Sequence, residues 1–253
     1  MNLNRALVSI VTPAYRAAEF IGDTIKSAQF QDHSDWEMLV VDDCSPDDTC
    51  TRVEVFVAAD PRVRLIRQTV NAGPAAARNV ALEQSKGRYI AFLDSDDLWM
   101  PRKLSTQLRF MQEREAALSF ADFRRITEDG ATVGRRISVP STLTYNELLC
   151  NTAIVTSTVM IDRAKTGPFS MPDAPYDDYA LWLSILRSGH VAHGLNRDLL
   201  RYRVVTNSVS RSKRVSAVRV WRTYRQIESL GLLKSAWSFA NYAVRGWLKY
   251  RVF

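Results

Sequence analysis

The sequence predicts an α/β protein built on a largely parallel central sheet with helices on both faces. Two observations lead to this fold class. Short apolar segments of strand length alternate four times with helical segments in the first half of the chain, an order typical of parallel strands joined by crossover helices. The same strands are mostly apolar rather than apolar only at every second residue, as expected for strands that are buried on both faces.

The first four strands are bounded by proline, glycine or acidic residues. We expect these strands at Leu7–Thr12, Trp36–Val41, Val63–Arg67 and Tyr89–Leu93. Helices are expected over about Glu19–Phe30, from a cap at Ser45, from Asn71-Ala72-Gly73-Pro74 to Lys86-Gly87, and over Pro101–Arg114. Ser45 suits a helix N-cap, with Pro46 and Asp48 at the first and third helical positions. Right-handed crossovers would bring the loops after strands one, two and four to one edge of the sheet.

After Ala116 the pattern changes. We expect strands over Ala117–Thr127 and Ala131–Val139 joined by a turn at Glu128-Asp129-Gly130, a short helix over Asn146–Cys150, a buried strand over Ile154–Ile161, a buried helix over Ala180–Leu186 and a late strand over Leu199–Val205. We therefore divide the chain into a body, residues 1–211, and a tail, residues 212–253. The body divides again into halves of about 1–100 and 116–211.

Composition limits the class of protein. The chain has 253 residues, 46% of them hydrophobic, which is enough for one large α/β domain. No run approaches the roughly 18–20 apolar residues of a membrane span. The N-terminus leads straight into a strand, so we expect no signal peptide. Three cysteines without metal-ligand spacing indicate reduced thiols in a cytoplasmic protein.

The net charge of +7 is concentrated in the tail. Residues 211–253 carry ten lysines and arginines and one acid, Glu228. Two helices are expected there, Ser212–Leu230 and Leu232–Tyr250, separated at Gly231. The second has an apolar stripe at helical spacing, made of Leu233, Ala236, Trp237, Ala240, Ala243, Val244, Trp247 and Leu248. A basic amphipathic helix with aromatic residues suits an anionic membrane surface, and the alternative is that the stripe packs on the body.

Carboxylates follow two of the expected parallel strands. Asp42 and Asp43 follow the second strand, and the run Asp94-Ser95-Asp96-Asp97 follows the fourth. Ligands of open α/β sheets bind outside the carboxyl ends of the strands, so these acids are predicted to line one crevice. Neighbouring carboxylates repel each other unless a cation lies between them, and Mg²⁺ or Mn²⁺ bound together with substrate phosphates is the usual solution. Taken alone, the second run could instead be an acidic turn that caps the helix near Pro101.

A second acidic pair, Asp177-Asp178, lies at the start of a buried helix. A carboxylate in that position is kept ionised by the helix dipole, so the pair suits a general base. Other side chains could meet phosphate oxygens; these are Arg78, Arg201, Arg203, Ser208 and Ser210. The three histidines lie in no motif, and there is no glycine-rich phosphate loop.

Two rival functions remain open at this point. A sugar-1-phosphate nucleotidyltransferase would share the sheet and the metal, but it needs a glycine-rich basic loop where Pro13-Ala14-Tyr15-Arg16-Ala17 stands. A non-catalytic protein that binds membranes or nucleic acid would depend entirely on the tail. Because the body is close to neutral, we expect no nucleic-acid partner.

Four segments in order, Val8–Tyr15, Val40–Ser45, Asn71–Asn79 and Gly87–Trp99, resemble those of the inverting family 2 glycosyltransferases, which have the GT-A fold. Asp178 with Tyr179 and Trp182 resembles the acid pair of that family. Tyr202-Arg203 followed by Asn207, Ser208 and Ser210 resembles its later conserved segment. The resemblance covers about residues 5–212. It is nearest to bacterial enzymes that build teichuronic acid, capsule or O-antigen units on a polyprenyl diphosphate.

The resemblance implies a role for each matching residue. Thr12, Pro13, Tyr15 and Asp42 would hold the nucleotide base, usually uracil, with Arg78 near the base and the diphosphate. Asp94 and the adjoining Ser95 would face the ribose or the donor sugar, and Asp96 would bind Mn²⁺ or Mg²⁺. Asp178 would be the catalytic base. The implied partners are a nucleotide-sugar donor and a lipid-linked glycan acceptor, for a peripheral protein on the inner face of the membrane.

The chain departs from the family pattern at two places. Many members have glutamate before the base, where this chain has Asp177. A histidine often follows the Tyr-Arg pair, where Val204-Val205-Thr206 stand here. A role for that histidine in binding the diphosphate therefore cannot be transferred.

Overall fold

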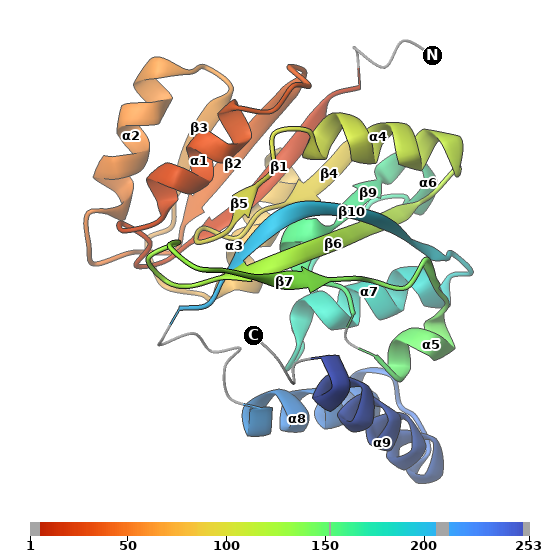
Figure 1. Ribbon diagram of the computed structural model, residues 1–253. Helices are drawn as coiled ribbons and strands as arrows, with labels where there is room; N and C mark the ends of the chain where they lie inside the picture. The colour runs from red at the N-terminus through yellow and green to blue at the C-terminus, as the bar shows by residue number, and fades with distance from the viewer. Residues whose placement is uncertain (1–5, 152, 206–212, 250–253) are drawn as a thin grey trace.

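The computed structural model describes residues 6–151, 153–205 and 213–249. It confirms the α/β class, with a central sheet flanked by helices (Figure 1). The strands are β1 (Val8–Ala14), β2 (Trp36–Asp42), β3 (Val63–Arg67), β4 (Tyr89–Phe92), β5 (Leu98–Trp99), β6 (Leu118–Ile126), β7 (Val133–Ile137), β8 (Thr142–Leu143), β9 (Met160–Asp162) and β10 (Ala192–Arg203). The α-helices are α1 (Ile21–Gln29), α2 (Thr49–Ala59), α3 (Pro74–Gln84), α4 (Lys103–Glu113), α5 (Tyr145–Leu149), α6 (Arg163–Thr166), α7 (Asp177–Arg187), α8 (Lys213–Arg222) and α9 (Leu232–Lys249).

The first four strands form the parallel half of the sheet, in the order β3-β2-β1-β4. Their side chains alternate between two apolar clusters, as buried strands require. Ile10 of β1 belongs to the cluster under α1, α2 and α4. Its neighbour Val11 belongs to the cluster under α3 and α7. Each strand therefore has apolar residues on both faces, which explains its mostly apolar sequence.

The short strand β9 joins the two halves of the sheet. It runs antiparallel to both β4 and β6, and β6 in turn runs parallel to β10. Arg88, just before β4, clamps this junction with two hydrogen bonds to the carboxylate of Asp162 at 2.7 and 2.8 Å. Because β4 and β6 share one direction, their carboxyl ends lie at the same edge of the sheet.

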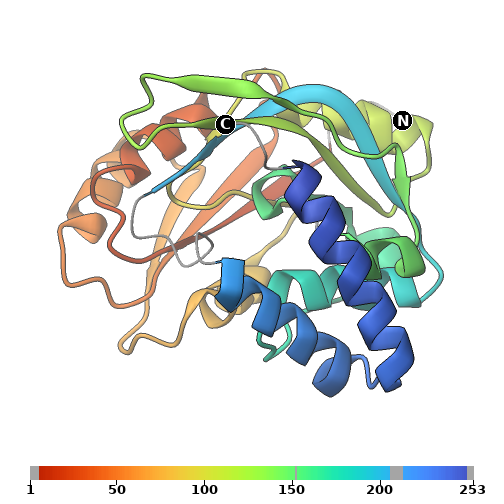
Figure 2. The ribbon, with the colours of Figure 1, turned by 60° about the horizontal axis from the view of Figure 1, so that its bottom comes forward.

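The C-terminal helices form a hairpin that packs beside α5 and α7 (Figures 1 and 2). Between them lies a π-helical turn, Thr223–Ile227. Val220, Tyr224 and Leu230 enter the apolar cluster that also contains α7, and Phe239 and Tyr242 of α9 pack against it. No helix in the described part of the chain has the length and apolar character needed to cross a membrane.

The structure settles how the apolar stripe of α9 is oriented. Its largest described members, Leu233, Trp237 and Val244, are 88%, 70% and 59% exposed. The opposite side of the helix carries Ser235 and Ser238, which are buried. The stripe therefore points away from the body, and the alternative that it packs on the body is wrong. The side chains of Trp247 and Leu248 lie outside the described residues.

Three expected element boundaries are wrong. Helix α2 begins at Thr49, with Asp48 as N-cap, because Ser45 is held in the loop between the Asp42 carboxylate and the backbone N–H of Arg16. The expected strand Ile154–Ile161 is a 3₁₀ turn, Thr156–Thr158, followed by β9. Strand β10 begins at Ala192, and its polar, irregular first half breaks the apolar pattern that marks its end.

Candidate active site

The carboxyl ends of β1, β2 and β4 meet at one edge, as the crossover argument predicts. Ala14 is in register with Asp42, and the N–H of Asp43 donates to the carbonyl of Ala14 at 2.8 Å. On the other side of β1, the N–H of Leu93 donates to the carbonyl of Val11 at 3.0 Å. These contacts place the end of the first strand between the two acidic strand ends.

The residues expected to hold the nucleotide base lie together at the β1–β2 edge. Thr12 and Pro13 are buried within β1, and the hydroxyl of Thr12 has no hydrogen-bond partner among the described residues. Tyr15, one residue past the strand, is 44% exposed. Asp42 is buried; its Oδ2 accepts from the N–H of Ser45, whereas Oδ1 has no partner in the described chain. Two unpaired buried polar atoms at a strand edge suit a polar ligand.

Asp43, predicted to line the crevice, has a structural role instead. Its two carboxylate oxygens accept hydrogen bonds from the N–H groups of Ala72 and Gly73, both at 2.8 Å. It thereby fixes the loop that leads into α3. The backbone donors lie about thirty positions later in the chain, where no local pattern could reveal them.

The Asp94–Asp97 run forms a tight turn behind β4. The N–H of Asp97 donates to the carbonyl of Asp94, and the hydroxyl of Thr24 donates to the carbonyls of Ser95 and Asp97. Burial, followed by the nearby charge of Asp94, raises the pKa of Asp96 to about 6. The turn therefore holds two carboxylates close together, and this makes the ionised form of Asp96 less favourable.

Asp97 is fully buried and does not cap α4, whose N-cap is Arg102. Its Oδ1 accepts from the N–H of Arg203 at the end of β10, at 2.9 Å. The Arg203 side chain in turn donates to the carbonyls of Asp96 and Glu128. Arg201 forms an ion pair with Asp198 at 2.6 Å. Two of the three arginines that were candidates for phosphate binding, Arg201 and Arg203, are thus engaged within the protein.

Arg78 joins the two groups of acids. It lies on α3 and is buried, and it donates to Asp94 at 2.7 Å and to Asp177 at 3.1 Å. Burial alone would lower the pKa of Arg78, but the charges of Asp94, Asp177 and Asp178 raise it above its ordinary value. The guanidinium group therefore stays charged and holds the end of β4 against the start of α7.

Asp178 is placed differently from Asp177. Its Oδ1 accepts from the N–H of Tyr179 at 2.6 Å, and its Oδ2 accepts from the hydroxyl of Thr156. The helix dipole was expected to keep this carboxylate ionised, but burial, followed by the charge of Asp177, raises the pKa of Asp178 to about 6, while Arg78 and Thr156 act in the opposite direction. A carboxylate with this pKa is mostly ionised at neutral pH and can take up a proton.

Two residues of the 3₁₀ turn were missed by the sequence reasoning. Thr156 binds Asp178, and the hydroxyl of the next residue, Ser157, accepts from the N–H of Asp94 at 3.0 Å. The Ser157 carbonyl also accepts from the indole N–H of Trp99. This turn therefore contacts both acidic groups. Its signal was three consecutive hydroxyl residues, Thr156-Ser157-Thr158, within an apolar stretch.

The acidic turn fits a divalent metal ion. Among the described residues, no three His, Cys, Asp or Glu side chains are grouped to hold a metal by themselves. Mg²⁺ and Mn²⁺ sites that include a substrate phosphate need only one or two carboxylates. A cation between Asp94 and Asp96 would also remove the repulsion that contributes to the raised pKa of Asp96.

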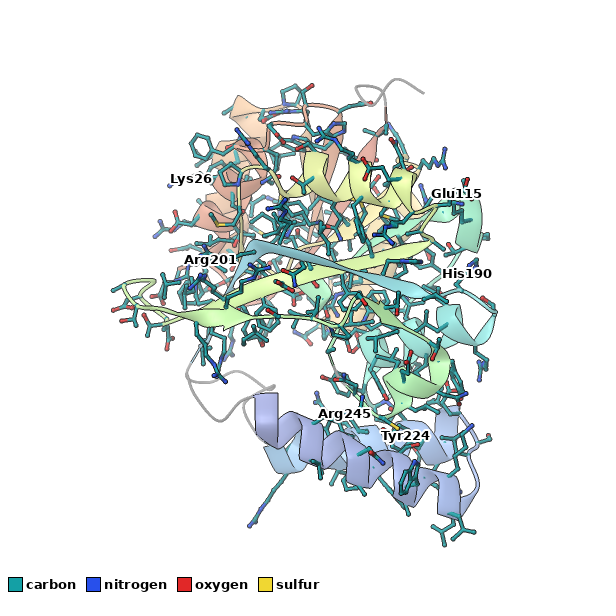
Figure 3. All side chains as sticks on the ribbon, turned by 45° about the vertical axis from the view of Figure 1, so that its right-hand side comes forward. Lys26, Glu115, His190, Arg201, Tyr224 and Arg245 are labelled. Atoms are coloured by element: carbon teal, nitrogen blue, oxygen red, sulfur yellow. The ribbon has the colours of Figure 1, made fainter. Side chains whose placement is uncertain are left out.

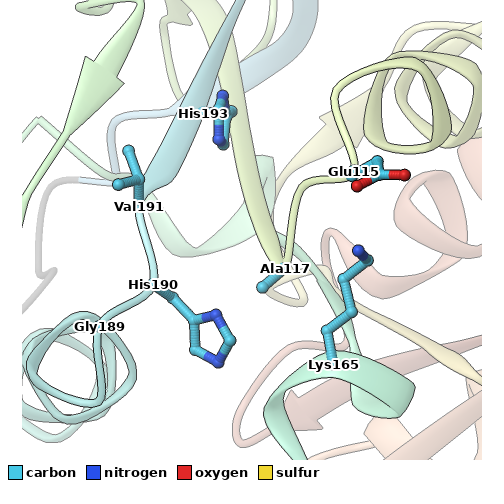
Figure 4. Close-up of a pocket in the computed structure, with 7 residues that line it drawn as sticks. All are labelled: Glu115, Ala117, Lys165, Gly189, His190, Val191 and His193. Atoms are coloured by element: carbon cyan, nitrogen blue, oxygen red, sulfur yellow. The ribbon is translucent and has the colours of Figure 1, made fainter.

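A cavity of about 410 Å³ lies at the other edge of the sheet (Figure 4). Its lining includes Glu115, Lys165, His190 and His193, near the amino ends of β6 and β10. Burial and the charge of Arg114 lower the pKa of His193. The acids described above lie at the carboxyl ends of strands parallel to these, so this cavity is separate from the candidate site.

The later segment Asn207, Ser208 and Ser210 lies outside the described residues. Among the expected site residues, Arg78 brings Asp94 close to the Asp177-Asp178 pair. Asp96 adjoins Asp94 in the same turn. The residues assigned to the nucleotide base lie at the adjacent strand ends. Thr12, Pro13 and Tyr15 are at the end of β1, and Asp42 is at the end of β2.

This sheet, with acids at the ends of its strands and a second acid pair opposite them, defines a GT-A glycosyltransferase fold. The crystal structure of Staphylococcus aureus TarS in complex with UDP-GlcNAc matches with a TM-score of 0.70 at 20% identity, covering 96% of this chain and 73% of that one. A Pyrobaculum calidifontis mannosyltransferase, PcManGT, in complex with GDP-Man and Mn²⁺ also matches at 0.70, with 18% identity and coverage of 94% and 73%.

Sequence comparison identifies the family to which the chain belongs. The model of the glycosyl transferase family 2 matches residues 9–165. The chain is 45% identical to Bacillus subtilis TuaG, a glycosyltransferase assigned to teichuronic acid biosynthesis, over 94% of this chain and 95% of TuaG. It is 38% identical to Escherichia coli WfgD, a UDP-Glc:alpha-D-GlcNAc-diphosphoundecaprenol beta-1,3-glucosyltransferase, over 85% and 84% of the two chains. The chain belongs to glycosyl transferase family 2 and is a glycosyltransferase.

The raised pKa of Asp178 predicts that its ionisation destabilises the fold. In the folded protein the carboxyl keeps its proton up to its pKa of about 6, whereas in the unfolded chain it loses the proton near the ordinary aspartate pKa of 3.8. The stability linked to this proton is complete below about pH 4 and is lost as the pH rises through 6. We expect Asp178→Asn to be more stable than the parent above pH 6, by on the order of 2 kcal/mol.

Urea unfolding at pH 4 and pH 8 would measure this difference, with the exposed Asp173→Asn as a control. The gain should appear only at the higher pH and only in Asp178→Asn. An equal gain at both pH values would show that the charge of Asp178 is not its cause.

Proposed function

We propose that this glycosyltransferase moves a sugar from a nucleoside diphosphate, UDP for preference, to a hydroxyl of a polyprenyl-diphosphate-linked glycan in bacterial surface polysaccharide synthesis. The observation that carries the proposal is the joining of the two acid groups by Arg78, at 2.7 and 3.1 Å. One group would meet the donor and the other the acceptor. On this proposal residues of about 1–100 form the donor half and residues 116–211 the acceptor half.

The relatives support this choice of substrates. WfgD is named for a UDP-Glc donor and a GlcNAc-diphosphoundecaprenol acceptor, and the chain matches 84% of its length. TarS has been crystallised with UDP-GlcNAc. Thr12, Pro13, Tyr15 and Asp42 are the residues we assign to the uracil end of the donor, with Arg78, Asp94 and Ser95 toward the ribose, diphosphate and sugar.

We assign the base to Asp178. Its carboxylate would take the proton of the acceptor hydroxyl while that oxygen attacks the anomeric carbon from the side opposite the leaving diphosphate. One displacement of this kind inverts the anomeric configuration. Thr156 and the N–H of Tyr179 hold the carboxylate in a fixed orientation. Asp177 accepts a hydrogen bond from Arg78, so we assign proton exchange to Asp178, the other member of the pair.

Asp96 is the residue that we assign to a divalent metal ion. A Mn²⁺ or Mg²⁺ ion there would supply positive charge to the departing diphosphate. The mannosyltransferase structure with GDP-Man and Mn²⁺ supports metal use within this fold. Asp94, paired with Arg78, borders the same place and would orient the donor.

An acceptor linked to undecaprenol diphosphate lies at a membrane. We therefore propose that the protein works as a peripheral protein on the inner face of the cell membrane, where nucleotide sugars are available. The positive charge of residues 211–253, with ten basic residues and one acid, is consistent with that location.

A panel of nucleotide sugars with Mn²⁺ and a GlcNAc-diphospholipid acceptor would test the reaction. We expect UDP release and an elongated lipid only when the UDP-sugar and acceptor are both present. Release of pyrophosphate from a nucleoside triphosphate and a sugar phosphate would instead identify a nucleotidyltransferase.

Asp178→Asn should abolish transfer and keep nucleotide binding. The amide can still accept from the N–H of Tyr179, so helix α7 keeps its start, but it cannot take up a proton. We expect kcat to fall by at least about a thousandfold, while calorimetry gives an unchanged Kd for UDP. Asp173→Asn serves as the matched control. Retained turnover in purified Asp178→Asn would refute its assignment as base.

Removal of divalent metal should stop the reaction. EDTA is expected to abolish UDP release, and excess Mn²⁺ or Mg²⁺ should restore it, because charge on the diphosphate must be neutralised as it leaves. Asp96→Asn should raise the Mn²⁺ concentration needed for half-maximal rate. Full activity in the chelator would make Asp96 a structural turn residue only.

A further inference from the structure

We propose that the outward face of the C-terminal hairpin is a docking surface for anionic lipid bilayers, with the apolar stripe of α9 inserted between the headgroups. The stripe consists of Leu233, Ala236, Trp237, Ala240, Ala243 and Val244, all exposed. This inference rests on the proposed function, because docking would bring the enzyme to its lipid-linked acceptor. Binding to the bilayer can nevertheless be measured without turnover.

The orientation of α9 is the first argument. In a surface helix that only packs on its own protein, the apolar side faces inward. Here the inward side carries Ser235 and Ser238, and the hydroxyl of Ser235 donates to the carbonyl of Gly231 at 3.0 Å. Leu233 and Trp237, at positions i and i+4 of the outer side, are 88% and 70% exposed. Leu233 and Trp237 are thus placed where only an external partner can cover them, whereas Phe239 and Tyr242 of the same helix pack on the body.

The charge on the hairpin is the second argument. The only acid between residues 211 and 253, Glu228, is turned inward, and its side chain is fully buried. It accepts from the hydroxyl of Tyr145 at 2.6 Å and pairs with Arg187 at 3.2 Å. The exposed charged side chains described on the hairpin are all cationic; they are Arg214, Arg222, Arg225, Lys234 and Arg245. Figure 3 labels Arg245, which lies on α9.

These charges favour a bilayer over a second copy of the chain. A two-fold dimer through this face would bring its cationic side chains near those of the other copy, and the described hairpin exposes no acid to neutralise them. Anionic headgroups supply that negative charge, at about 1 kcal/mol for each basic residue near the surface. A tryptophan beside leucine and valine is also the side-chain set typical of helices that lie in the interface of a bilayer.

The hairpin is firmly attached to the part of the body that carries Asp178. Tyr224 of the π-helical turn lies 6.5 Å, ring to ring, from Tyr179, the residue after Asp178 on α7. Both hydroxyls reach α5, donating to the carbonyls of Leu148 and Leu149. A bilayer held by α9 would therefore fix the orientation of α7 relative to the headgroup plane, where the diphosphate of the acceptor lies.

Vesicle sedimentation with the full chain would test the proposal. We expect binding to phosphatidylcholine vesicles that contain about 30% phosphatidylglycerol, weaker binding without the anionic lipid, and a loss of affinity as salt screens the charges. The double variant Leu233→Gln and Trp237→Gln should bind at least about tenfold more weakly, because it removes the inserted side chains. Both positions are exposed, so folding should be unaffected.

Phe30→Gln is the matched control, because Phe30 is 73% exposed at the end of α1 and lies outside the hairpin. It should bind vesicles like the parent. The double variant should also keep UDP release with a water-soluble acceptor analogue, so failure of docking is distinguishable from failure of the proposed function. Equal vesicle binding by parent and double variant, or no binding by the parent, would overturn the proposal. So would a lipid-free dimer that the double variant abolishes.

Discussion

The buried guanidinium of Arg78 is the interaction on which the site depends. The carboxylates of Asp94, at a strand end, and Asp177, at a helix start, would repel each other in a partly buried place without a cation between them. Arg78 supplies that charge from α3, a helix that belongs to neither acidic segment. Its planar donors fit two carboxylates at once, so it sets their separation as well as their charge. The substitution of aspartate for the family's more frequent glutamate at position 177 is compatible with this short contact.

The strands in the first half of the chain could be predicted because each is a short, mostly apolar run with polar or turn-forming residues at its ends. Mostly apolar runs such as Trp36–Val41, bounded by acids, end within a residue of where the structure ends them. Parallel pairing followed from the helices between them. The edge at which Asp42 and Asp94 meet then followed from handedness, without any knowledge of individual contacts.

What could not be predicted depends on partners far away in the chain. Asp43 and Asp97 have the same chemistry as Asp42 and Asp96, yet they bind backbone N–H groups, the first in the loop before α3 and the second at Arg203. The Thr156–Thr158 turn has the composition of a strand, but its hydroxyls bind Asp178 and the backbone of Asp94. Strand β10 starts among polar residues because its first half pairs parallel with β6 through register shifts.

The junction at β9 has a consequence for how substrates enter and products leave. Many two-part sites open by rotating one half away from the other about a hinge. Here both halves hydrogen-bond to the same three-residue strand, and Arg88 clamps its last residue, Asp162. Separation of the halves would break the sheet itself. The floor of the candidate site is therefore one continuous sheet, and we expect substrates to enter and products to leave without separation of its two halves.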